Sequence, residues 1–363
     1  MNSNLWRATR RDILKFGAVG AAAAMMPAAM TTRAIAAGNG AFKIIHSSPA
    51  SLLLWSVTYL AEDMGYYKEE GLDVERVGLN GGPAAMTGLL TGNGNVNVSA
   101  PGELLSANAK GQRVKVLEGY TTADAYDFVV TKAFAAELRI TADSSLADRQ
   151  AALAKAKGRR FGITAPGSQT DLTTRIALRQ VGLDPNGDVQ IVPMGNILNV
   201  FTGLSQGAVE GGVLLAPFTQ QAGHEFGTVT LLSVTKGDLP EASKMQGQVL
   251  EARPEDVEAN PDAYAAFVKA DLRALRMIKE APDEARDKLR TTRFSKLPEE
   301  LWPAIWASQL PTFDNPRVTP DKLRAWIETG SIGGNPDPQT FPYDKVIDMR
   351  FVEKGLADLG WSI

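Results

Sequence analysis

The sequence predicts an α/β protein of two lobes, each a mainly parallel β-sheet flanked by helices. From residue 42 onward, short β-branched runs alternate with longer helical patterns, which is typical of βαβ units. The chain has 363 residues, enough for a leader and two domains of roughly 150 residues each. Its residues are 44% apolar and include no cysteine, so we expect a hydrophobic core rather than disulfides to stabilise each lobe.

The chain opens with a pattern typical of an export signal. Residues 9–15 match the twin-arginine pattern except at Ile13, which stands in the place of the usual phenylalanine. The apolar stretch at residues 16–30 is shorter than the about 20 residues that span a bilayer. A small-x-small site for signal peptidase ends at Ala36. We therefore expect residues 1–36 to be a twin-arginine signal peptide, cleaved near Ala36, and the mature protein to reside in the periplasm.

Charge and composition argue against several classes of function. Residues 1–36 carry five basic residues and one acidic residue, so their removal changes the net charge from −3 to −7. An acidic protein is a poor partner for nucleic acid or anionic lipid. The absence of cysteine excludes thiolate catalysis and cysteine-based metal sites. The two histidines, His46 and His224, lack metal-ligand spacing, so we expect neither a metal nor a cofactor.

Four β-branched runs predict the sheet of the first lobe. These strands are expected at residues 42–46, 72–79, 96–99 and 114–118. Helical patterns between them are expected at residues 51–65, 83–90 and 101–110. Because a helix separates each strand from the next, we expect the strands to run parallel.

A second alternating region predicts the other lobe. Its strands are expected at residues 127–130, 161–164, 189–192 and 212–215, and its helices at residues 168–181 and 197–204. The run at residues 229–232 predicts the strand that carries the chain back to the first lobe. The pattern after about residue 260 is helical. We therefore expect residues 41–125 and 231–363 to form lobe one and residues 126–230 to form lobe two.

The turns between strands and helices predict the position of a cleft, because ligands of open α/β sheets bind at the carboxyl ends of the strands. Most of these turns place a small residue before a proline at the expected first helical position. They are Ser47-Ser48-Pro49, Gly81-Gly82-Pro83, Ala100-Pro101, Ala216-Pro217 and the serine-capped turn at residues 166–171. Each helix start offers unpaired backbone N–H groups and the positive end of a helix dipole. No turn contains Lys or Arg, so the pattern predicts a cleft that holds its ligand by amides and hydroxyls, although any single turn is equally an ordinary helix cap.

Three stretches resemble a known family of receptors. Residues 59–75, YLAEDMGYYKEEGLDVE, resemble the first helix and second strand of the sulfonate/taurine/nitrate-type substrate-binding family, which also includes binders of pyrimidine thiamine precursors. Residues 81–92, GGPAAMTGLLTG, are similar to the family's second turn and helix. The stretches 167–168 and 203–210 stand where its second lobe has similar elements. The resemblance covers residues 42–360 and implies a type II periplasmic-binding-protein fold, with two crossover connections, that closes on its ligand.

The resemblance also implies which residues contact a ligand. By position in the turns, these are Ser47, Ser48, Gly82, Ala100, Pro101, Ser168 and Gln169. Tyr126 and Phe218 lie close to predicted strand ends, and as pocket residues they would favour a flat organic ligand over nitrate. His46 ends the first predicted strand, where it suits either a donor to a ligand carbonyl or a partly buried core position.

Two departures from the family pattern leave the ligand class open. Many members have Trp-Asp-Pro-Phe after the last strand of lobe two, whereas this chain has Leu-Ala-Pro-Phe at residues 215–218. The common Val-Asp-Ala before that strand is replaced by Val-Glu-Gly at residues 209–211. Because the acidic group at position 216 is missing, a sulfonate cannot be assumed. We expect a small organic or oxyanion ligand bound between the lobes, such as a sulfonate, an aromatic carboxylate or a pyrimidine-like molecule.

The resemblance implies the periplasmic solute-binding component of an ABC importer. Its expected partners are a small-molecule ligand and an inner-membrane permease with its ATPase, and we expect a monomer with no enzymatic activity. Two alternatives remain: a thiamine-pyrimidine-precursor synthase-like enzyme on the same fold, and a sensor subunit for a receptor kinase. The synthase resemblance requires a cysteine-rich motif, which this chain lacks. The Gly-x-Ser-x-Gly at residues 203–207 is preceded by a predicted helix and followed by a strand, the reverse of a nucleophile elbow.

Overall fold

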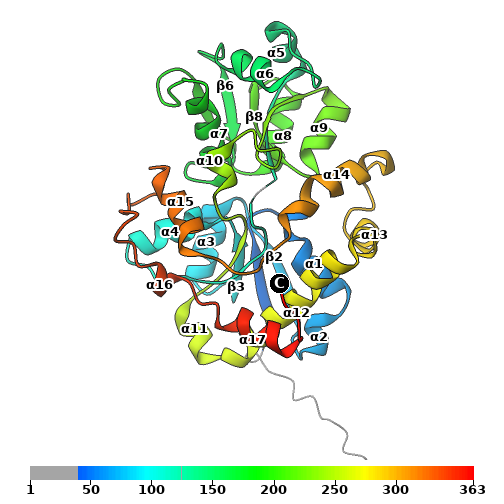
Figure 1. The fold of residues 1–363 in the computed structure, drawn as a ribbon, viewed down its shortest axis with the longest axis vertical. Helices are drawn as coiled ribbons and strands as arrows, with labels where there is room; N and C mark the ends of the chain where they lie inside the picture. Colours follow the sequence, from blue (N-terminus) through cyan, green and yellow to red (C-terminus); the bar gives the residue numbers. More distant parts are fainter. Residues whose placement is uncertain (1–39, 124) are drawn as a thin grey trace, which may run out of the picture. The chain divides into compact units, whose positions relative to one another are not determined.

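The computed structural model describes residues 40–123 and 125–363, so the expected signal peptide lies outside the described residues. Two five-stranded sheets organise this part of the chain (Figure 1). The first, in lobe one, has the order β2 (Val74–Gly78), β1 (Phe42–His46), β3 (Val96–Ser99), β10 (Val249–Ala252) and β4 (Lys115–Gly119). The second, in lobe two, has the order β7 (Gln190–Pro193), β6 (Arg160–Ile163), β8 (Gly211–Leu215), β5 (Tyr126–Val130) and β9 (Val229–Ser233). The predicted α/β fold class of two helix-flanked sheets is confirmed.

Each sheet is parallel except where the chain enters it from the other lobe. β1 pairs in parallel with β2 and β3, and β6 pairs in parallel with β7 and β8. β5 and β10 run antiparallel to their neighbours. The chain passes between the lobes after β4 and returns after β9, which are the two expected crossovers. A strand that enters from the cleft edge runs opposite to strands whose carboxyl ends point to that edge, so the crossovers account for the antiparallel strands.

The expected boundary of lobe two is wrong at one point. Residues 229–232 do form a strand, but β9 pairs with β5 in the second sheet instead of returning to the first. The expected boundary after residue 230 therefore cuts through β9. The returning strand is β10, which the sequence analysis missed. Glu251 stands in the middle of this short strand, and a buried carboxylate there obscures the apolar pattern by which strands are recognised.

Helices cover both sheets. In lobe one they are η1 (Leu53–Trp55), α1 (Ser56–Asp63), α2 (Tyr66–Glu69), α3 (Gly82–Leu90), α4 (Pro101–Ala109), α11 (Pro254–Ala259), α12 (Pro261–Glu280), α13 (Pro282–Thr292), η2 (Glu299–Leu301), α14 (Trp302–Gln309), η3 (Leu310–Thr312), α15 (Pro320–Glu328), α16 (Tyr343–Val346) and α17 (Arg350–Asp358). In lobe two they are α5 (Lys132–Leu138), α6 (Leu146–Leu153), α7 (Gln169–Gln180), α8 (Ile197–Ser205), α9 (Phe218–Phe226) and α10 (Pro240–Ser243). Among the described helices, none has the length and apolar character that crossing a bilayer demands.

Prolines do not begin these helices as uniformly as expected. Pro101 is the first residue of α4, as predicted, but Pro83 is the second residue of α3. Pro217 lies one residue before α9, and the helix after Pro49 starts only at Leu53. Proline is tolerated at a cap and throughout the first turn, because the N–H groups there lack helical partners. The turn sequences therefore locate helix starts to within a few residues.

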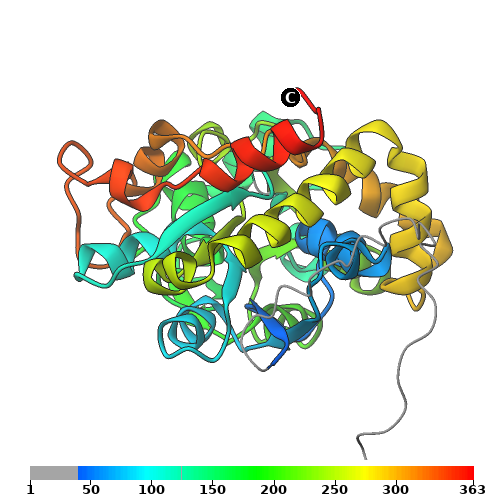
Figure 2. The ribbon, with the colours of Figure 1, turned by 90° about the horizontal axis from the view of Figure 1, so that it is seen from below.

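The long helix α12 fixes the core of lobe one. It packs beside α17 and α1 (Figure 2), and its Phe267 ring stacks on Phe42 of β1 at 5.0 Å between ring centroids. Both rings are fully buried, and burying one such side chain contributes about 1.5–3 kcal/mol to stability. Asp271, also fully buried in α12, accepts hydrogen bonds from the hydroxyls of Tyr67 and Tyr120. α12 thus joins α2 and the end of β4 through both apolar and polar contacts.

Candidate functional site

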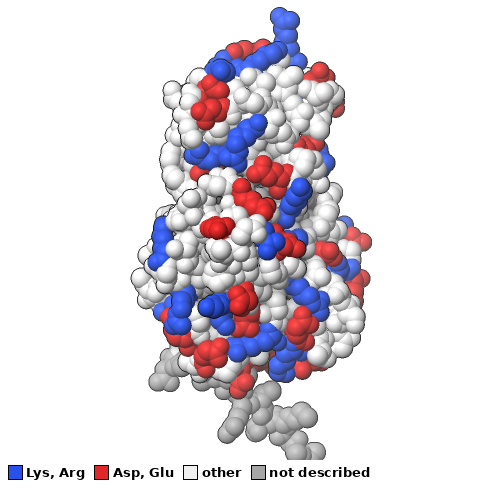
Figure 3. All heavy atoms as spheres, turned by 60° about the vertical axis from the view of Figure 1, so that its left-hand side comes forward, with Lys and Arg blue, Asp and Glu red and all other residues white. Residues whose placement is uncertain are grey.

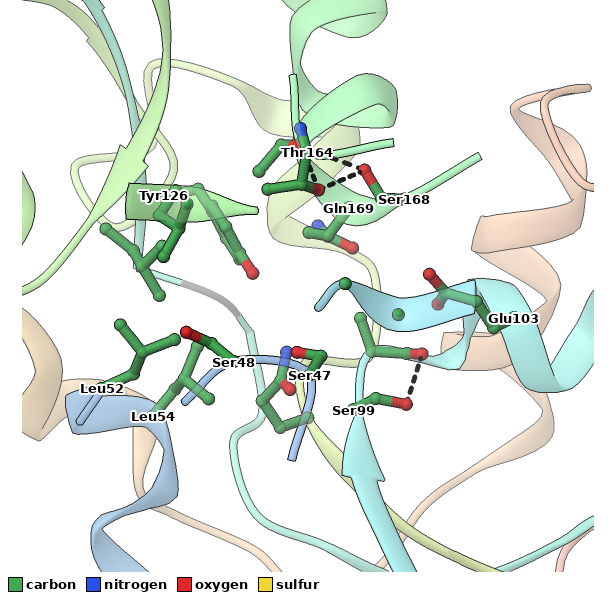
Figure 4. A pocket seen from close by; sticks show the side chains of 17 residues that line it. Ser47, Ser48, Leu52, Leu54, Ser99, Glu103, Tyr126, Thr164, Ser168 and Gln169 are labelled. Atoms are coloured by element: carbon green, nitrogen blue, oxygen red, sulfur yellow. Dashed lines mark hydrogen bonds between the residues drawn. The ribbon is translucent and has the colours of Figure 1, made fainter. Parts of the chain in front are cut away.

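A cavity of about 60 Å³ lies where the carboxyl ends of strands from both sheets meet (Figure 4). Both lobes contribute to its wall. The lining residues are Ser47, Ser48, Leu52, Leu54, Gly81, Gly82, Ser99, Ala100, Glu103, Tyr126, Thr164, Ser168, Gln169, Thr170, Ile197, Leu215 and Gln248. This is the position that the sheet topology predicts for a ligand.

The lobes approach each other closely at glycines beside the cavity. A Cβ atom on Gly81 would lie 2.9 Å from the carbonyl oxygen of Gly195, and one on Gly102 would lie 3.2 Å from that of Gly167. Gly81 also has a φ of 92°, which side chains of L-residues rarely permit. Asn196 donates to Asn80 across the same edge at 3.4 Å. Small residues are therefore needed in these turns for the two lobes to enclose the cavity.

Lobe one contributes the ends of β1 and β3 and the starts of α3 and α4. Ser47 and Ser48 follow β1, and the Ser48 hydroxyl accepts a hydrogen bond from the backbone N–H of Ala50 at 3.1 Å. Ser99 ends β3, where its hydroxyl accepts from Asn97 at 3.0 Å. Gly82 is the first residue of α3. A Cβ at this position would overlap the carboxylate of Glu103, so glycine lets that carboxylate pack directly against the start of α3.

Lobe two contributes a closed ring of hydroxyls. Thr164, Ser168 and Thr170 lie with their three side-chain oxygens 2.9 Å apart. Ser168 is also the N-cap of α7, since its oxygen accepts from the backbone N–H of Asp171 at 3.4 Å. Each hydroxyl has a single proton, and three protons complete the three bonds of the ring. The ring therefore links the three side chains to one another and rigidifies this turn.

Gln169 follows this ring and differs from it in one respect. The side chain is buried, with 7% of its surface exposed, and it lines the cavity. Its Oε1 atom has no hydrogen-bond partner among the described residues. Because leaving a buried polar atom unpaired costs about 1–3 kcal/mol, this oxygen is a site where a bound molecule would be stabilised.

Glu103, in the first turn of α4, is the one charged residue among those that line the cavity. Removal from water raises the pKa of its carboxyl group to about 7. The neighbouring carboxyl of Glu251 is fully buried, and its pKa is raised well above the usual value, first by burial and also by the charge of Glu103. Lys and Arg are absent from the residues lining the cavity, so no cation in its wall neutralises Glu103.

The structure brings most of the sequence-predicted site residues together. Those that line the cavity are Ser47, Ser48, Gly82, Ala100, Tyr126, Ser168 and Gln169. Three others do not line it: His46, Pro101 and Phe218. Whether any of these residues contacts a ligand remains a prediction.

The three residues outside the cavity wall are packed into the surrounding structure. His46 is buried and its ring stacks on Trp55 at 4.3 Å. Burial, and then the positive charge of Arg76, hold the pKa of His46 well below its usual value. Phe218 packs against Phe201 at 5.3 Å between ring centroids, and Pro101 is buried at the start of α4. His46 therefore has the environment of a core residue in this structure.

Ten lining residues were not singled out from the sequence: Leu52, Leu54, Gly81, Ser99, Glu103, Thr164, Thr170, Ile197, Leu215 and Gln248. Most lie in, or within a few residues of, one of the strand-to-helix turns of the cleft. Glu103 had a usable signal, because it stands three residues after Ala100, in the first turn of a helix that starts at the predicted cleft. Gln248 had none, because it immediately precedes the unrecognised strand β10.

Comparisons with known proteins agree with this fold. Residues 56–292 match the model of the NMT1-like family. A structure from Bordetella bronchiseptica RB50 has 22% sequence identity and a TM-score of 0.73, covering 88% of this chain and 98% of its own. The periplasmic nitrate-binding protein NrtA from Synechocystis PCC 6803 has 16% identity and a TM-score of 0.67, covering 88% of each chain. The alkanesulfonate-binding protein SsuA from Xanthomonas axonopodis pv. citri, bound to MOPS, has 15% identity and a TM-score of 0.64, covering 86% of this chain and 100% of its own.

No curated protein matches the sequence significantly. At these identities the structural likenesses establish the fold alone. That fold is the expected type II periplasmic-binding-protein fold.

Proposed function

Because the chain belongs to the NMT1-like family, we propose that it is the periplasmic solute-binding component of an ABC importer. The observation that carries this proposal is the cavity, which takes its wall from both lobes at the carboxyl ends of their strands. A ligand there touches both lobes at once. Ligand contacts across the cleft would stabilise the closed arrangement of the two lobes, which is the form that such a component presents to a permease.

The composition of the cavity wall favours binding over turnover. The lining residues include no histidine and no cysteine, and the hydroxyl of Ser168 is engaged in the ring with Thr164 and Thr170. A serine nucleophile needs an adjacent general base within hydrogen-bond reach, and no imidazole is placed to serve Ser168. This arrangement supports a receptor rather than a synthase-like enzyme.

Export and partners complete the proposal. The twin-arginine pattern and the Ala36 site support export to the periplasm followed by cleavage, and we propose that the mature protein acts as a monomer. On the face that Figure 3 shows, acidic and basic side chains are interspersed, without a broad basic area. This distribution favours a small-molecule ligand and a membrane permease over nucleic acid.

A ligand screen on residues 37–363 tests the proposed function. We expect at least one member of a panel of sulfonates, aromatic carboxylates, nitrate, pyrimidines and amines to raise the melting temperature, because a ligand that binds only the folded state stabilises it. Uptake of that ligand should fall in cells that lack this protein and recover when it is restored. Consumption of the ligand by the purified protein would contradict the receptor role, and unchanged uptake would contradict the transport role.

A further inference from the structure

We propose that the cleft selects a small organic ligand that presents an N–H donor or a positive charge to Glu103 and Gln169, with its apolar part toward Leu52 and Leu54. This inference rests on the proposed function and specifies the ligand class of the same site. It differs from the oxyanion ligands named for the structural neighbours.

The charged group in the cavity wall is an acid, Glu103. Glu103 supplies the one carboxylate among the lining residues, and no Lys or Arg among them opposes it. An ionised carboxylate only accepts hydrogen bonds, and it disfavours an anion placed beside it. The cavity wall is therefore suited to a ligand that donates.

The start of α3 at Gly82 lies on the cavity wall, where a helix N-terminus would otherwise attract an anion. Helix N-termini attract anions through their free N–H groups and dipole, and α3 begins at Gly82 on the cavity wall. The carboxylate of Glu103 packs directly against Gly82. A sulfonate or nitrate bound at the start of α3 would therefore lie beside a carboxylate, which disfavours a second anion.

Lobe two presents an unpaired hydrogen-bond acceptor, Oε1 of Gln169, to the cavity. Oε1 of Gln169 is buried in the cavity wall without a partner among the described residues. The neighbouring hydroxyls of Thr164, Ser168 and Thr170 bond to one another, and none of them donates to Oε1 of Gln169. A donor group placed between Glu103 and Gln169 would satisfy acceptors from both lobes.

The cavity has an apolar side and a charged side. Figure 4 shows Leu52, Leu54 and Tyr126 on one side and Glu103 on the other. Ile197 and Leu215 add further apolar wall. An apolar ligand part gains by leaving water at such a wall, which an inorganic ion cannot do. The ligand is therefore an amphipathic organic molecule.

Matched probes test the ligand class. Propyl and benzyl compounds, each carrying an ammonium, hydroxyl, carboxylate or sulfonate group, would be titrated into residues 37–363 by calorimetry at pH 8. We expect one of the ammonium probes to bind at least tenfold more tightly than the carboxylate and sulfonate on the same carbon body. Glu103→Gln, which keeps the size but removes the charge, should weaken that probe at least tenfold. The exposed Glu225 of α9 provides the matched control, and Glu225→Gln should bind like the wild type.

The outcomes separate this inference from the proposed function. Tighter binding of a carboxylate or sulfonate, or unchanged ammonium affinity in Glu103→Gln, would overturn the ligand class while leaving a binding protein. Failure of every matched probe to bind would also overturn it, and the wider ligand screen would then decide the receptor role by itself. Gln169→Leu gives a second test in the other lobe, with a loss of about tenfold expected. Far-ultraviolet circular dichroism and a ligand-free melting curve establish that each variant folds.

Discussion

The carboxylate of Glu103 packs against Gly82 so closely that a side chain of any size at position 82 would overlap Oε1. This contact joins the first turn of α4 to the start of α3. It influences the position of the one charged group in the cavity wall, so under the proposed ligand class Gly82 affects recognition although it has no functional group of its own.

Gly82→Ala should therefore weaken ligand binding with little effect on stability. The new methyl group meets only the far end of the flexible Glu103 side chain, so the carboxylate moves and the backbone does not. We expect at least a tenfold loss of affinity, measured by calorimetry, with a change of less than about 1 kcal/mol in the free energy of unfolding. Full affinity in this variant would show that the position of the carboxylate does not matter. Gly81→Ala provides the contrast, because its Cβ meets backbone and its φ is positive, and it should cost about 1–3 kcal/mol of stability.

Ser168 and Gln169 should respond differently to substitution, although they are neighbours on the same turn. Ser168→Ala removes the N-cap of α7 and opens the hydroxyl ring, so it should lower the free energy of unfolding by about 0.5–2 kcal/mol. Gln169→Ala removes an acceptor that is unpaired in the structure, so it should weaken ligand binding by about 1 kcal/mol and leave unfolding nearly unchanged. Chemical denaturation and calorimetry on both variants measure the two effects. A loss of affinity confined to Ser168→Ala would contradict this assignment.

The raised pKa of Glu103 predicts a pH dependence of stability in the ligand-free protein. Burial raises the pKa of this carboxyl from 4.5 to about 7 in the folded state, so between these values the folded protein binds more protons at this group than the unfolded chain does. The contribution of Glu103 to the free energy of unfolding therefore falls as the pH rises from about 4.5 to about 7.

The Glu103→Gln variant isolates this contribution from those of the other buried acids, among them the neighbouring Glu251. Because Glu103 keeps some contact with solvent, we expect the variant to be more stable than the wild type by about 1 kcal/mol at pH 8, after allowance for solvent screening. The difference should be smaller at pH 4.5. Urea unfolding at both pH values measures it, and a wild type that is more stable than the variant at pH 8 would show that the carboxylate has a stabilising partner.

Asp271 should be important for stability rather than for binding. Its carboxyl group is fully buried, accepts from the hydroxyls of Tyr67 and Tyr120, and lies outside the cavity wall. Asp271→Ala leaves both hydroxyls unpaired in the core, at an expected cost of about 3 kcal/mol. Tyr67→Phe removes one hydroxyl and its bond together, so it should cost less. Urea unfolding compares the two, and an equal or smaller loss in Asp271→Ala would contradict the role of the carboxylate.

The periodicity of the sequence was sufficient to predict most of the strands and helices, because β-branched runs and helix caps favour these elements through local interactions. Every predicted strand overlaps a strand of the structure, from β1 at Phe42–His46 to β9 at Val229–Ser233. The sheet that β9 joins is determined by tertiary packing against β5, and the sequence of β9 alone does not predict it. β10 was hidden for a related reason. Glu251 is stable in the middle of this strand because Asn97, distant in sequence, donates to it at 2.6 Å.

The candidate site was predictable where turns define it and unpredictable where packing does. Ser47, Gly82 and Gln169 were found because they lie at strand-to-helix turns. The sequence did not predict that Ser168 stabilises the turn whereas Gln169 faces the cavity with an unpaired oxygen. The hydroxyl ring that engages Ser168 depends on the fold of the whole turn. His46 also stands at a strand end, but its stacking on Trp55 turns it into the core. A position at a strand end locates a residue near the cleft without fixing the direction of its side chain.

Titration calorimetry of residues 37–363 with the ligand found by the screen tests the central claim most directly. The account predicts one ligand per chain, no chemical change in the ligand, and at least a tenfold loss of affinity in Gln169→Leu at unchanged ligand-free stability. Wild-type affinity in Gln169→Leu and in Glu103→Gln together would contradict it, because the ligand would then bind elsewhere than in the cavity between the lobes.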